Sequence, residues 1–253
     1  MGGRVGKRLL AILLFACSTG WSAVALNNVS TPDRQAGGSY SGSHSVTAGG
    51  SNIVAFAAIN WDGTAIGAVT AITYGGQAMT SCGAASTAGT SGGAALQWFY
   101  LANPPTGSNT LAVTVSNSPT EIYATMISFT GVDQATPVRS GTYQMTTSST
   151  TPGTTFTAAI NSDASDLTVT AIADDTGIVS TNQTQEWSNT TGVMEQYGDM
   201  ATTPASSVTH TWTFGGSSVS FVWAGFSVKD AGVTFTPAPY RTGLIINAPV
   251  TVR

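Results

Sequence analysis

Few residues in this chain have the types and the spacing that catalysis requires. Gly89, Ser91 and Gly93 fit the G-x-S-x-G pattern, in which a serine hydroxyl at a sharp strand-to-helix turn acts as a nucleophile. That mechanism also needs a helix after the turn, and an acid and a histidine as partners of the serine. The pattern lies here in a Gly/Ser/Thr-rich stretch with no helical periodicity. We therefore interpret it as a loop and expect no catalytic residues and no enzymatic activity.

The histidines and glutamates do not form a recognisable constellation either. A zinc site built on His44 or His210 would need further ligands, and the sequence near them supplies none. A glycosidase needs two carboxylates about 5 to 10 Å apart across a cleft. Glu121, Glu186 and Glu195 are the candidates, but nothing in their spacing brings any two together. We interpret these three residues as surface acids.

Two adjacent aspartates, Asp174 and Asp175, are followed by Thr176 and Gly177 in a turn-like context. Calcium prefers several oxygen ligands supplied by a loop, so this pair could contribute to a calcium site. Two neighbouring aspartates are equally typical of an ordinary exposed turn. Calcium is the one cofactor that the sequence suggests.

Tryptophans offer the best candidates for a non-catalytic binding site. Trp61 and Trp187 lie beside predicted turns, where a flat ring could stack on the face of a sugar. Trp98, Trp212 and Trp223 lie within predicted strands, where core packing is the expected role. The sequence therefore predicts a possible glycan partner at Trp61 and Trp187.

The first 25 residues have the organisation of an export leader. Basic residues stand near the start, residues 9–16 form a short apolar run, and Ala23 and Ala25 supply an A-x-A cleavage pattern. The apolar run is shorter than the roughly 20 residues needed to span a bilayer, so we expect no transmembrane span. A signal peptide over residues 1–25 predicts an extracellular or cell-surface protein. A buried N-terminal helix is the alternative.

A second interpretation of the leader involves Cys17. Residues 14–17, with the sequence LFAC, resemble the box of bacterial lipoproteins, in which the cysteine is lipidated and becomes the new N-terminus. Phe15 is unusual within that box. The sequence leaves open whether the leader is cleaved after Ala25 or before Cys17.

Charge and cysteine content narrow the class of protein further. Without the leader, five basic residues stand against twelve acidic ones, which leaves no basic surface for nucleic acid. Cys82 is then the single cysteine, so it cannot form an internal disulfide. No basic residue near Cys82 would activate its thiol, and we expect a structural cysteine.

Short β-prone runs recur along the chain, and no window has a helical period. The clearest runs are residues 52–59, 96–101, 110–115, 123–129, 166–173, 208–214 and 219–229. Residues 52–59 are apolar throughout, which is typical of a strand covered on both faces. Residues 31–50 and 81–93 are Gly/Ser-rich and predict loops, the first around a weak strand. We therefore predict an all-β fold, an antiparallel β-sandwich resembling a jelly roll, as one domain over residues 26–230.

Two further features refine this prediction. Gly75 and Gly76 lie between two β-prone runs and predict a hairpin, because a type I′ turn needs a positive φ at both central residues. The second half of the chain also resembles the first, since residues 52–59, 111–115 and 123–129 are echoed by residues 166–173, 208–212 and 221–228. Each half would supply one set of strands to the jelly roll; the alternative is that any two Thr/Val-rich strands look alike.

Several of these runs carry a family resemblance. They are residues 69–80, residues 96–107 ending in NPPTG, residues 127–137 containing GVDQATP, and residues 223–229, WAGFSVK. Together they resemble a β-sandwich domain repeated in secreted bacterial surface proteins, with a match from Val46 to Asp230. The resemblance implies an extracellular building block of large surface proteins, with no catalytic residues to carry over.

The tail, residues 231–253, continues with strand-like character after the stiff Pro237-Ala238-Pro239 spacer. Its apolar and β-branched residues are Leu244, Ile245, Ile246, Val250 and Val252. Such a segment is an aggregation hazard when exposed, so it should pair with a sheet edge. It could fold back on its own chain, or add to a neighbouring subunit and build an oligomer or fibre.

The sequence thus favours a non-enzymatic structural or adhesive protein that is secreted or held at the cell surface or in the extracellular matrix. A carbohydrate-binding module is the first alternative. A virion decoration or tail protein is the second, because similar sandwiches occur there.

Overall fold

In the residues that its computed structural model describes, all regular secondary structure consists of antiparallel strands. The described residues are 23–63, 66–88, 93–148, 154–174, 177–191, 194–203, 205–215 and 221–232. Eighteen strands and no helix occur in these ranges, so the predicted all-β class is confirmed. The strands form four sheets, which we number I to IV in the order in which they stack.

The first half of the chain builds sheets I and II. Sheet I has the order β2-β9-β4-β5, and sheet II has the order β1-β10-β3-β8-β6, with β7 also paired to β8. Their bounds are β1 Ala25–Ala36, β2 Ser39–Val46, β3 Val54–Gly63, β4 Val69–Tyr74, β5 Gln77–Ala78, β6 Thr80–Ser81, β7 Ser86–Ala88, β8 Gly93–Ala102, β9 Gly107–Val115 and β10 Glu121–Thr130.

The second half builds sheets III and IV. Sheet III has the order β11-β18-β13-β16-β15, and sheet IV has the order β12-β17-β14. Their bounds are β11 Gln144–Ser148, β12 Thr155–Asn161, β13 Leu167–Asp174, β14 Ile178–Thr181, β15 Thr184–Asn189, β16 Glu195–Met200, β17 Ser207–Phe214 and β18 Phe221–Val228.

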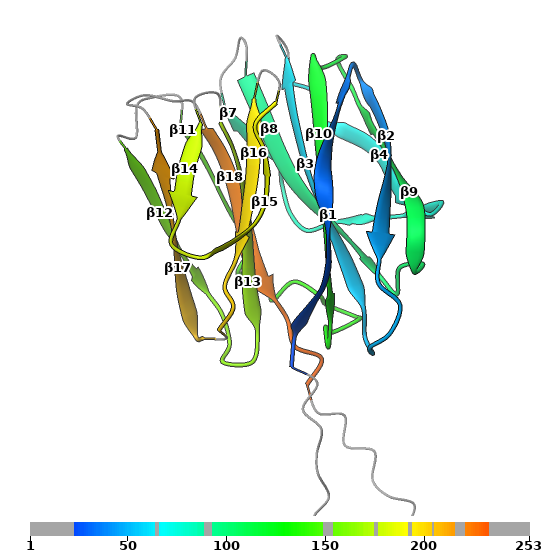
Figure 1. Cartoon of the computed structure of the whole chain (residues 1–253), viewed down its shortest axis with the longest axis vertical. Helices are drawn as coiled ribbons and strands as arrows, with labels where there is room; N and C mark the ends of the chain where they lie inside the picture. Colours follow the sequence, from blue (N-terminus) through cyan, green and yellow to red (C-terminus); the bar gives the residue numbers. More distant parts are fainter. Residues whose placement is uncertain are drawn as a thin grey trace, which may run out of the picture.

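The four sheets stack face to face with three apolar cores between them (Figure 1). One core lies between sheets I and II, one between II and III, and one between III and IV. Sheets II and III are therefore covered on both faces. Strands β3, β13 and β18 are buried along their whole length, which confirms the prediction made from the apolar run at residues 52–59.

Each half of the chain is a jelly roll of its own. In sheet II the order β1-β10-β3-β8 pairs the first strand with the last, and in sheet I the order β2-β9-β4-β5 pairs the second strand with the next-to-last. Sheets III and IV repeat these orders as β11-β18-β13-β16 and β12-β17-β14. The internal repeat is thus confirmed, but not the expectation that each half supplies one set of strands to a shared jelly roll.

Short polar strands account for the other differences from the sequence prediction. Residues 39–46 form the full strand β2, whose Tyr40, His44 and Val46 are buried on alternate positions. Within the Gly/Ser-rich run predicted as an exposed loop, β6 and β7 pair with β8, and Ser86 and Ala88 are buried. Small side chains carry little hydrophobic signal, so their burial depends on the neighbouring strand.

The predicted hairpin is present. Gly75 and Gly76 have φ angles of 56° and 80°, and the turn pairs Tyr74 with Gln77. Both positive φ values suit glycine, as a type I′ turn requires.

Aromatic side chains dominate the core between sheets II and III. The Phe226 ring of β18 lies 5.1 Å from that of Phe56 and 5.3 Å from that of Trp98, centroid to centroid. The Trp98 indole N–H also donates a hydrogen bond to the carbonyl of Ala224 at 3.1 Å, across the two halves. Trp98 meets Trp187 edge to face at 5.9 Å. The two jelly rolls are therefore joined by a continuous core.

This shared core predicts that the two halves unfold together. Phe226→Ala should lower the free energy of unfolding by about 3–5 kcal/mol, as expected for a buried phenylalanine. Urea denaturation followed by tryptophan fluorescence and circular dichroism measures the loss. Met145→Ala, at an exposed position of β11, is the control and should change stability by less than about 0.5 kcal/mol. Two separate transitions in the unaltered protein would contradict the prediction.

Val24 extends the same core at the end where the described chain begins. Its side chain is 5% exposed and belongs to the core between sheets II and III. The ladder between β1 and β10 starts directly after it, with Ala25 opposite Thr130. Cleavage after Ala25 would remove this buried side chain, whereas cleavage before Cys17 would keep it.

Two chains that differ at this end test the contribution of Val24. The free energy of unfolding of a chain starting at Leu26 should be about 1–3 kcal/mol lower than that of a chain starting at Ala23. The shorter chain lacks a buried valine and the first position of the ladder. Thermal and urea unfolding of the two purified chains measure the difference. Equal stabilities would show that Val24 contributes nothing to the core.

Candidate functional site

Strand β4 of sheet I has an incomplete neighbour on its outer side. It pairs with β9 along its length, but with β5 only at Thr73 and Tyr74. The Met79 N–H donates one further bond to the Ile72 carbonyl at 3.1 Å, and the chain then crosses to sheet II as β6. Within the described residues, positions 69–71 of β4 therefore have a strand neighbour on one side only. We call these three residues the open edge of β4.

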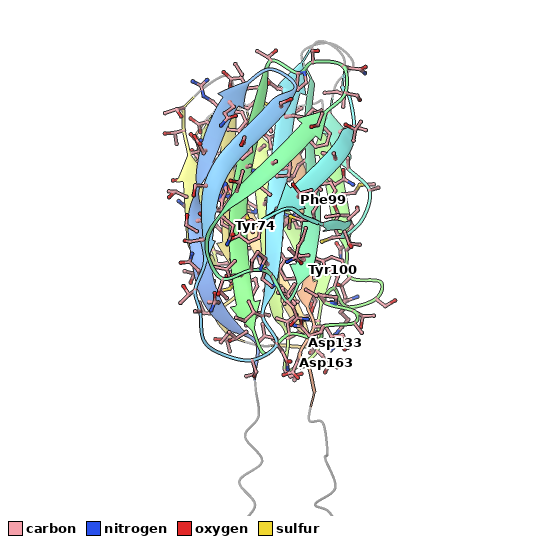
Figure 2. All side chains as sticks on the ribbon, turned by 90° about the vertical axis from the view of Figure 1, so that its right-hand side faces the viewer. Tyr74, Phe99, Tyr100, Asp133 and Asp163 are labelled. Carbon is pink, nitrogen blue, oxygen red and sulfur yellow. The ribbon has the colours of Figure 1, made fainter. Side chains whose placement is uncertain are left out.

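A groove of about 450 Å³ runs beside this edge, between sheets I and II. Its lining contains no charged side chain and consists of Val69, Thr70, Ala71, Ile72, Thr73, Ala78, Met79, Ser81 and Phe99. Phe99 of β8 comes from sheet II, and the β4 residues come from sheet I. Figure 2 shows this side of the molecule and labels Phe99, together with Tyr74 at the end of β4.

The opposite side of the same jelly roll is closed. The chain passes there from β1 in sheet II to β2 in sheet I. The Asn28 side chain donates a hydrogen bond to the Ser45 carbonyl at 2.7 Å. Gln35 donates to the Ser41 carbonyl at 2.7 Å and accepts from the Ser41 N–H at 2.9 Å. These hydrogen bonds link the two sheets at that side. The side at β4, where the groove lies, is therefore the more accessible side of this sandwich.

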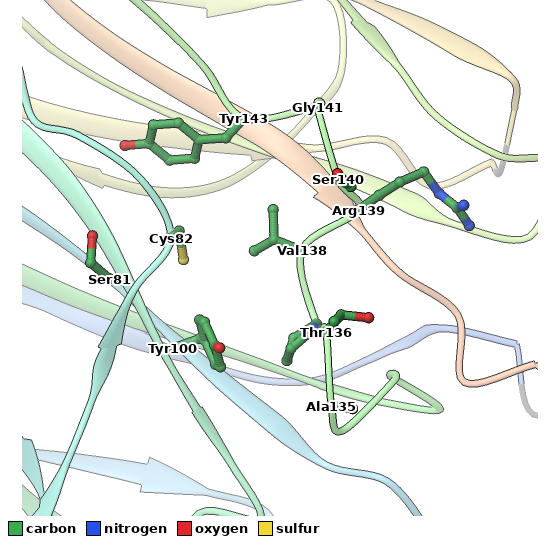
Figure 3. A pocket seen from close by; sticks show the side chains of 11 residues that line it. Ser81, Cys82, Tyr100, Ala135, Thr136, Val138, Arg139, Ser140, Gly141 and Tyr143 are labelled. Carbon is green, nitrogen blue, oxygen red and sulfur yellow. The ribbon is translucent and has the colours of Figure 1, made fainter.

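A second, smaller pocket of about 270 Å³ lies where the two halves are joined (Figure 3). It is formed between Cys82 and Tyr100 of the first half and the connecting segment that includes Val138 and Tyr143. The Tyr143 hydroxyl donates to the Ala84 carbonyl at 2.8 Å, and burial raises the pKa of the Cys82 thiol well above its ordinary value. A thiol held in its neutral form is a poor nucleophile. Cys82 is thus a structural cysteine.

The region where the two halves are joined, which we call the joint, also gives a physical reason for the GVDQATP run at residues 131–137. The Asp133 carboxylate accepts the N–H groups of Ala135 and Thr136 at 2.9 and 3.0 Å and pairs with the Lys229 ammonium at 2.7 Å. The Gln134 side chain accepts the Asn103 N–H at 3.1 Å. These contacts fix the turn that leads from β10 into the second half, so the run specifies structure.

Arg139 completes the joint but faces away from the pocket in Figure 3. Its guanidinium forms a double contact with the buried carboxylate of Asp166, and lies 3.3 Å from Asp163. Burial alone would raise the pKa of Asp166. The Arg139 guanidinium, the Asp230 N–H and the Ser227 hydroxyl nevertheless hold it below its ordinary value. Asp133 and Asp163 lie at the pole where the described chain begins and ends (Figure 2).

A buried polar network lies between sheets III and IV. The His210 Nδ1 is 2.8 Å from Asp199 Oδ1, and its Nε2 is 2.9 Å from the Thr168 hydroxyl. A hydroxyl, a histidine and an aspartate in this order have the geometry of a nucleophile with its base and orienting acid. All three side chains are fully buried, so no substrate can reach the hydroxyl in this structure. The Thr170 hydroxyl also donates to Asp199, and we interpret the network as structural.

Two of the three glutamates are held by neighbouring groups. Glu121 is 8% exposed, forms an ion pair with Arg34, and accepts the Tyr123 hydroxyl at 2.5 Å. Glu195 accepts the Tyr197 hydroxyl at 2.5 Å. Burial and the charge of Asp199 raise the pKa of Glu186. Glu121 is thus a buried ion-pair partner and not the surface acid that the sequence suggested.

The two tryptophans predicted as sugar platforms lie in the cores. Trp61 is fully buried between sheets I and II, and Trp187 is 4% exposed between sheets II and III. The Trp187 ring covers Gly198, where an added Cβ would be 1.9 Å from it. Neither ring presents a face to solvent. In each case the strand that contains the tryptophan continues past the position where the sequence predicted a turn. No glycan site can be built on them here.

The remaining predicted residues are only partly described. Asp174 is fully buried at the end of β13, and Asp175 lies outside the described residues. Within the described ranges, no three His, Cys, Asp or Glu side chains are grouped so as to hold a metal ion. The tail residues Leu244, Ile245, Ile246, Val250 and Val252 also lie outside these ranges. Calcium binding and tail pairing stay predictions.

Comparisons with known proteins add no assignment. No protein-family model matches the chain, and no curated protein or solved structure matches it. Among the described residues, no helix is long and apolar enough to cross a membrane.

His44 provides a test of the core between sheets I and II. The side chain is 2% exposed, and its Nε2 lies 2.7 Å from the Tyr40 hydroxyl. Burial lowers its pKa to about 4, against an opposing effect of the Asp33 charge. The unfolded chain therefore takes up this proton near pH 6.5, whereas the folded chain takes it up only near pH 4.

The free energy of unfolding should consequently fall as the pH drops from about 6.5 to about 4. The loss from His44 should reach about 3 kcal/mol at the lower end of this window. Urea unfolding at a series of pH values measures it. His44→Gln keeps an acceptor for Tyr40 but does not titrate, so its stability should depend less on pH. The same pH dependence in both proteins would contradict a buried neutral histidine.

Proposed function

We propose that the protein is an exported structural or adhesive component of the cell surface, and that it assembles through its C-terminal segment. The observation that carries the proposal is the incomplete pairing of the outer sheets. Sheet I has the open edge at β4, and among the described residues no further strand follows β14 at the end of sheet IV. An unpaired strand edge is a template for another strand.

The build of the body supports a mechanical role. The core between sheets II and III and the contacts of Asp133 and Arg139 hold the two jelly rolls together. Both faces of the inner sheets, II and III, are buried in the packing of the four sheets. A ligand or a partner therefore has the outer faces, the edges and the poles to bind to.

The outer faces are rich in hydroxyl groups and poor in charge. Along β2, Ser39, Ser41, Ser43 and Ser45 are exposed on alternate positions, and the Ser43 and Ser108 hydroxyls are 2.7 Å apart. Thr157 and Thr211 form a similar pair at 3.2 Å on sheet IV. Such surfaces are solvated without long charged side chains, which suits a protein packed among copies of itself outside the cell.

The location follows from the leader. Export by the first 25 residues would place the body outside the cytoplasm, and lipidation at Cys17 would anchor it near the pole where the described chain begins. The tail would leave from the same pole, since the described chain also ends there (Figure 1). Both ends would then be available for attachment while the opposite pole projects.

Assembly is tested by removing the tail. The full chain should form complexes whose size grows with protein concentration, because an apolar strand gains a sheet neighbour on association. A chain that ends at Gly232 keeps every described residue and should sediment as a monomer at all concentrations. Sedimentation velocity on both chains measures this. A full chain that stays monomeric throughout would sink the proposal.

A further inference from the structure

Resting on the proposed function, we propose that the acceptor of the C-terminal segment is the groove at the open edge of β4. The occupant is residues 244–252 of a second copy of this chain. It would lie along β4 as an added strand and place alternate side chains in the groove between sheets I and II.

The groove has what an added strand needs. Residues 69–71 of β4 offer backbone groups along about 10 Å, with no strand on that side among the described residues. Beside them, Ile72, Met79 and Phe99 are largely buried, at 6%, 8% and 6% exposure, and form the floor and far wall. Main-chain pairing with an edge combined with pockets for alternate side chains is how β-strand addition works.

The tail has the matching pattern. Positions 244, 246, 248, 250 and 252 are Leu, Ile, Ala, Val and Val, so one face of an extended strand is apolar throughout. The other face carries Ile245 and then Asn247, Pro249 and Thr251, so it is the more polar of the two. A proline is tolerated in an edge strand when the position of its missing N–H faces solvent. The apolar face belongs in the groove, and the direction in which the added strand runs must place the backbone nitrogen of Pro249 on the side away from β4.

Charge and reach agree with this occupant. The groove lining is uncharged, and residues 242–252 contain no charged side chain. Eleven residues lie between Gly232, the last described residue, and Leu244, and the extended chain between these two residues spans up to about 40 Å. Two prolines within this spacer favour an extended path. The segment can thus extend well beyond its own body and meet a neighbour.

Substitutions on both sides of the contact test the register. Ile246→Asp puts a charge on the apolar face, and Asn247→Asp puts the same charge on the opposite face. Ile246→Asp should weaken association at least about tenfold, and Asn247→Asp should not, because only the first charge enters the groove. On the acceptor side, Ala71→Arg should weaken it as much, and Thr110→Arg, exposed on β9 outside the groove, should not.

Disulfide trapping identifies the two surfaces directly. Full chains carrying Val69→Cys, at a groove position whose side chain packs against the core between sheets I and II, are mixed with full chains carrying Ile246→Cys and oxidised, and peptide mass spectrometry reads the linked positions. The native Cys82 thiol is half-buried, its raised pKa makes it a poor nucleophile, and it stays in place. A disulfide between positions 69 and 246 of two chains is expected. A double variant that instead closes this disulfide within one chain would overturn the assignment to a second copy.

The remaining outcomes separate this inference from the proposed function. If the full chain assembles through its tail but Ala71→Arg has no effect and the 69–246 disulfide does not form, the acceptor is elsewhere and only this inference fails. If the full chain never assembles, both fail.

Discussion

The apolar contact between sheets II and III is the constraint on which the rest of the structure depends. Each jelly roll has one sheet that packs against its own partner sheet and against the other half. Phe56, Trp98 and Phe226 meet at the centre of this contact. A sheet that is buried on both faces needs mostly apolar side chains, and β3, β13 and β18, which are buried along their whole length, are mostly apolar. Neither half could present such a sheet to water alone.

The same contact determines which polar groups are buried and which hydrogen-bond partners they find. Gln196 of β16 accepts the Thr125 hydroxyl at 2.8 Å and donates to the Ala58 carbonyl at 3.3 Å, so one amide bridges the halves. Between sheets III and IV, Asp199 is surrounded by donors from His210 and Thr170. Buried polar groups without partners are costly, and these networks also oppose sliding of one sheet over the next.

Much of the fold could be predicted because these constraints leave a signal in the sequence. The uninterrupted apolar run of β3 predicted burial on both faces, and Gly75 and Gly76 predicted the hairpin. What could not be predicted was the assignment of strands to layers. The echo between the halves is compatible with one shared jelly roll or with two, because similar strands can pair in either arrangement. Only the pairing of β1 with β10 and of β11 with β18 distinguishes them.

The candidate site was less predictable for a related reason. Trp61 lies beside a run that looks like a turn in sequence, but β3 continues to Gly63 and carries the ring into the core. The groove at β4 is lined by small, β-branched and larger apolar residues from three separate segments of the chain, and such a set has no distinctive local pattern. It exists because β5 ends after two residues, and such an early end is a property of the pairing between strands, invisible in local composition. The tail, in contrast, carries a signal in its own sequence, since alternate apolar residues in an uncharged segment predict pairing with a sheet edge.

These two properties also explain why the edges, and not the faces, should carry the interactions of this protein. Stacking four sheets consumes both faces of II and III and one face each of I and IV. The faces that remain are lined by serine and threonine, whose hydroxyls water satisfies well and which offer a partner little apolar area. At the open edge of β4, by contrast, backbone that has a strand neighbour on one side only, among the described residues, lies beside the gap between two sheets. A strand that fills the gap gains hydrogen bonds and buries apolar surface in one step, so an edge of three residues beside a groove can outweigh a much larger polar face.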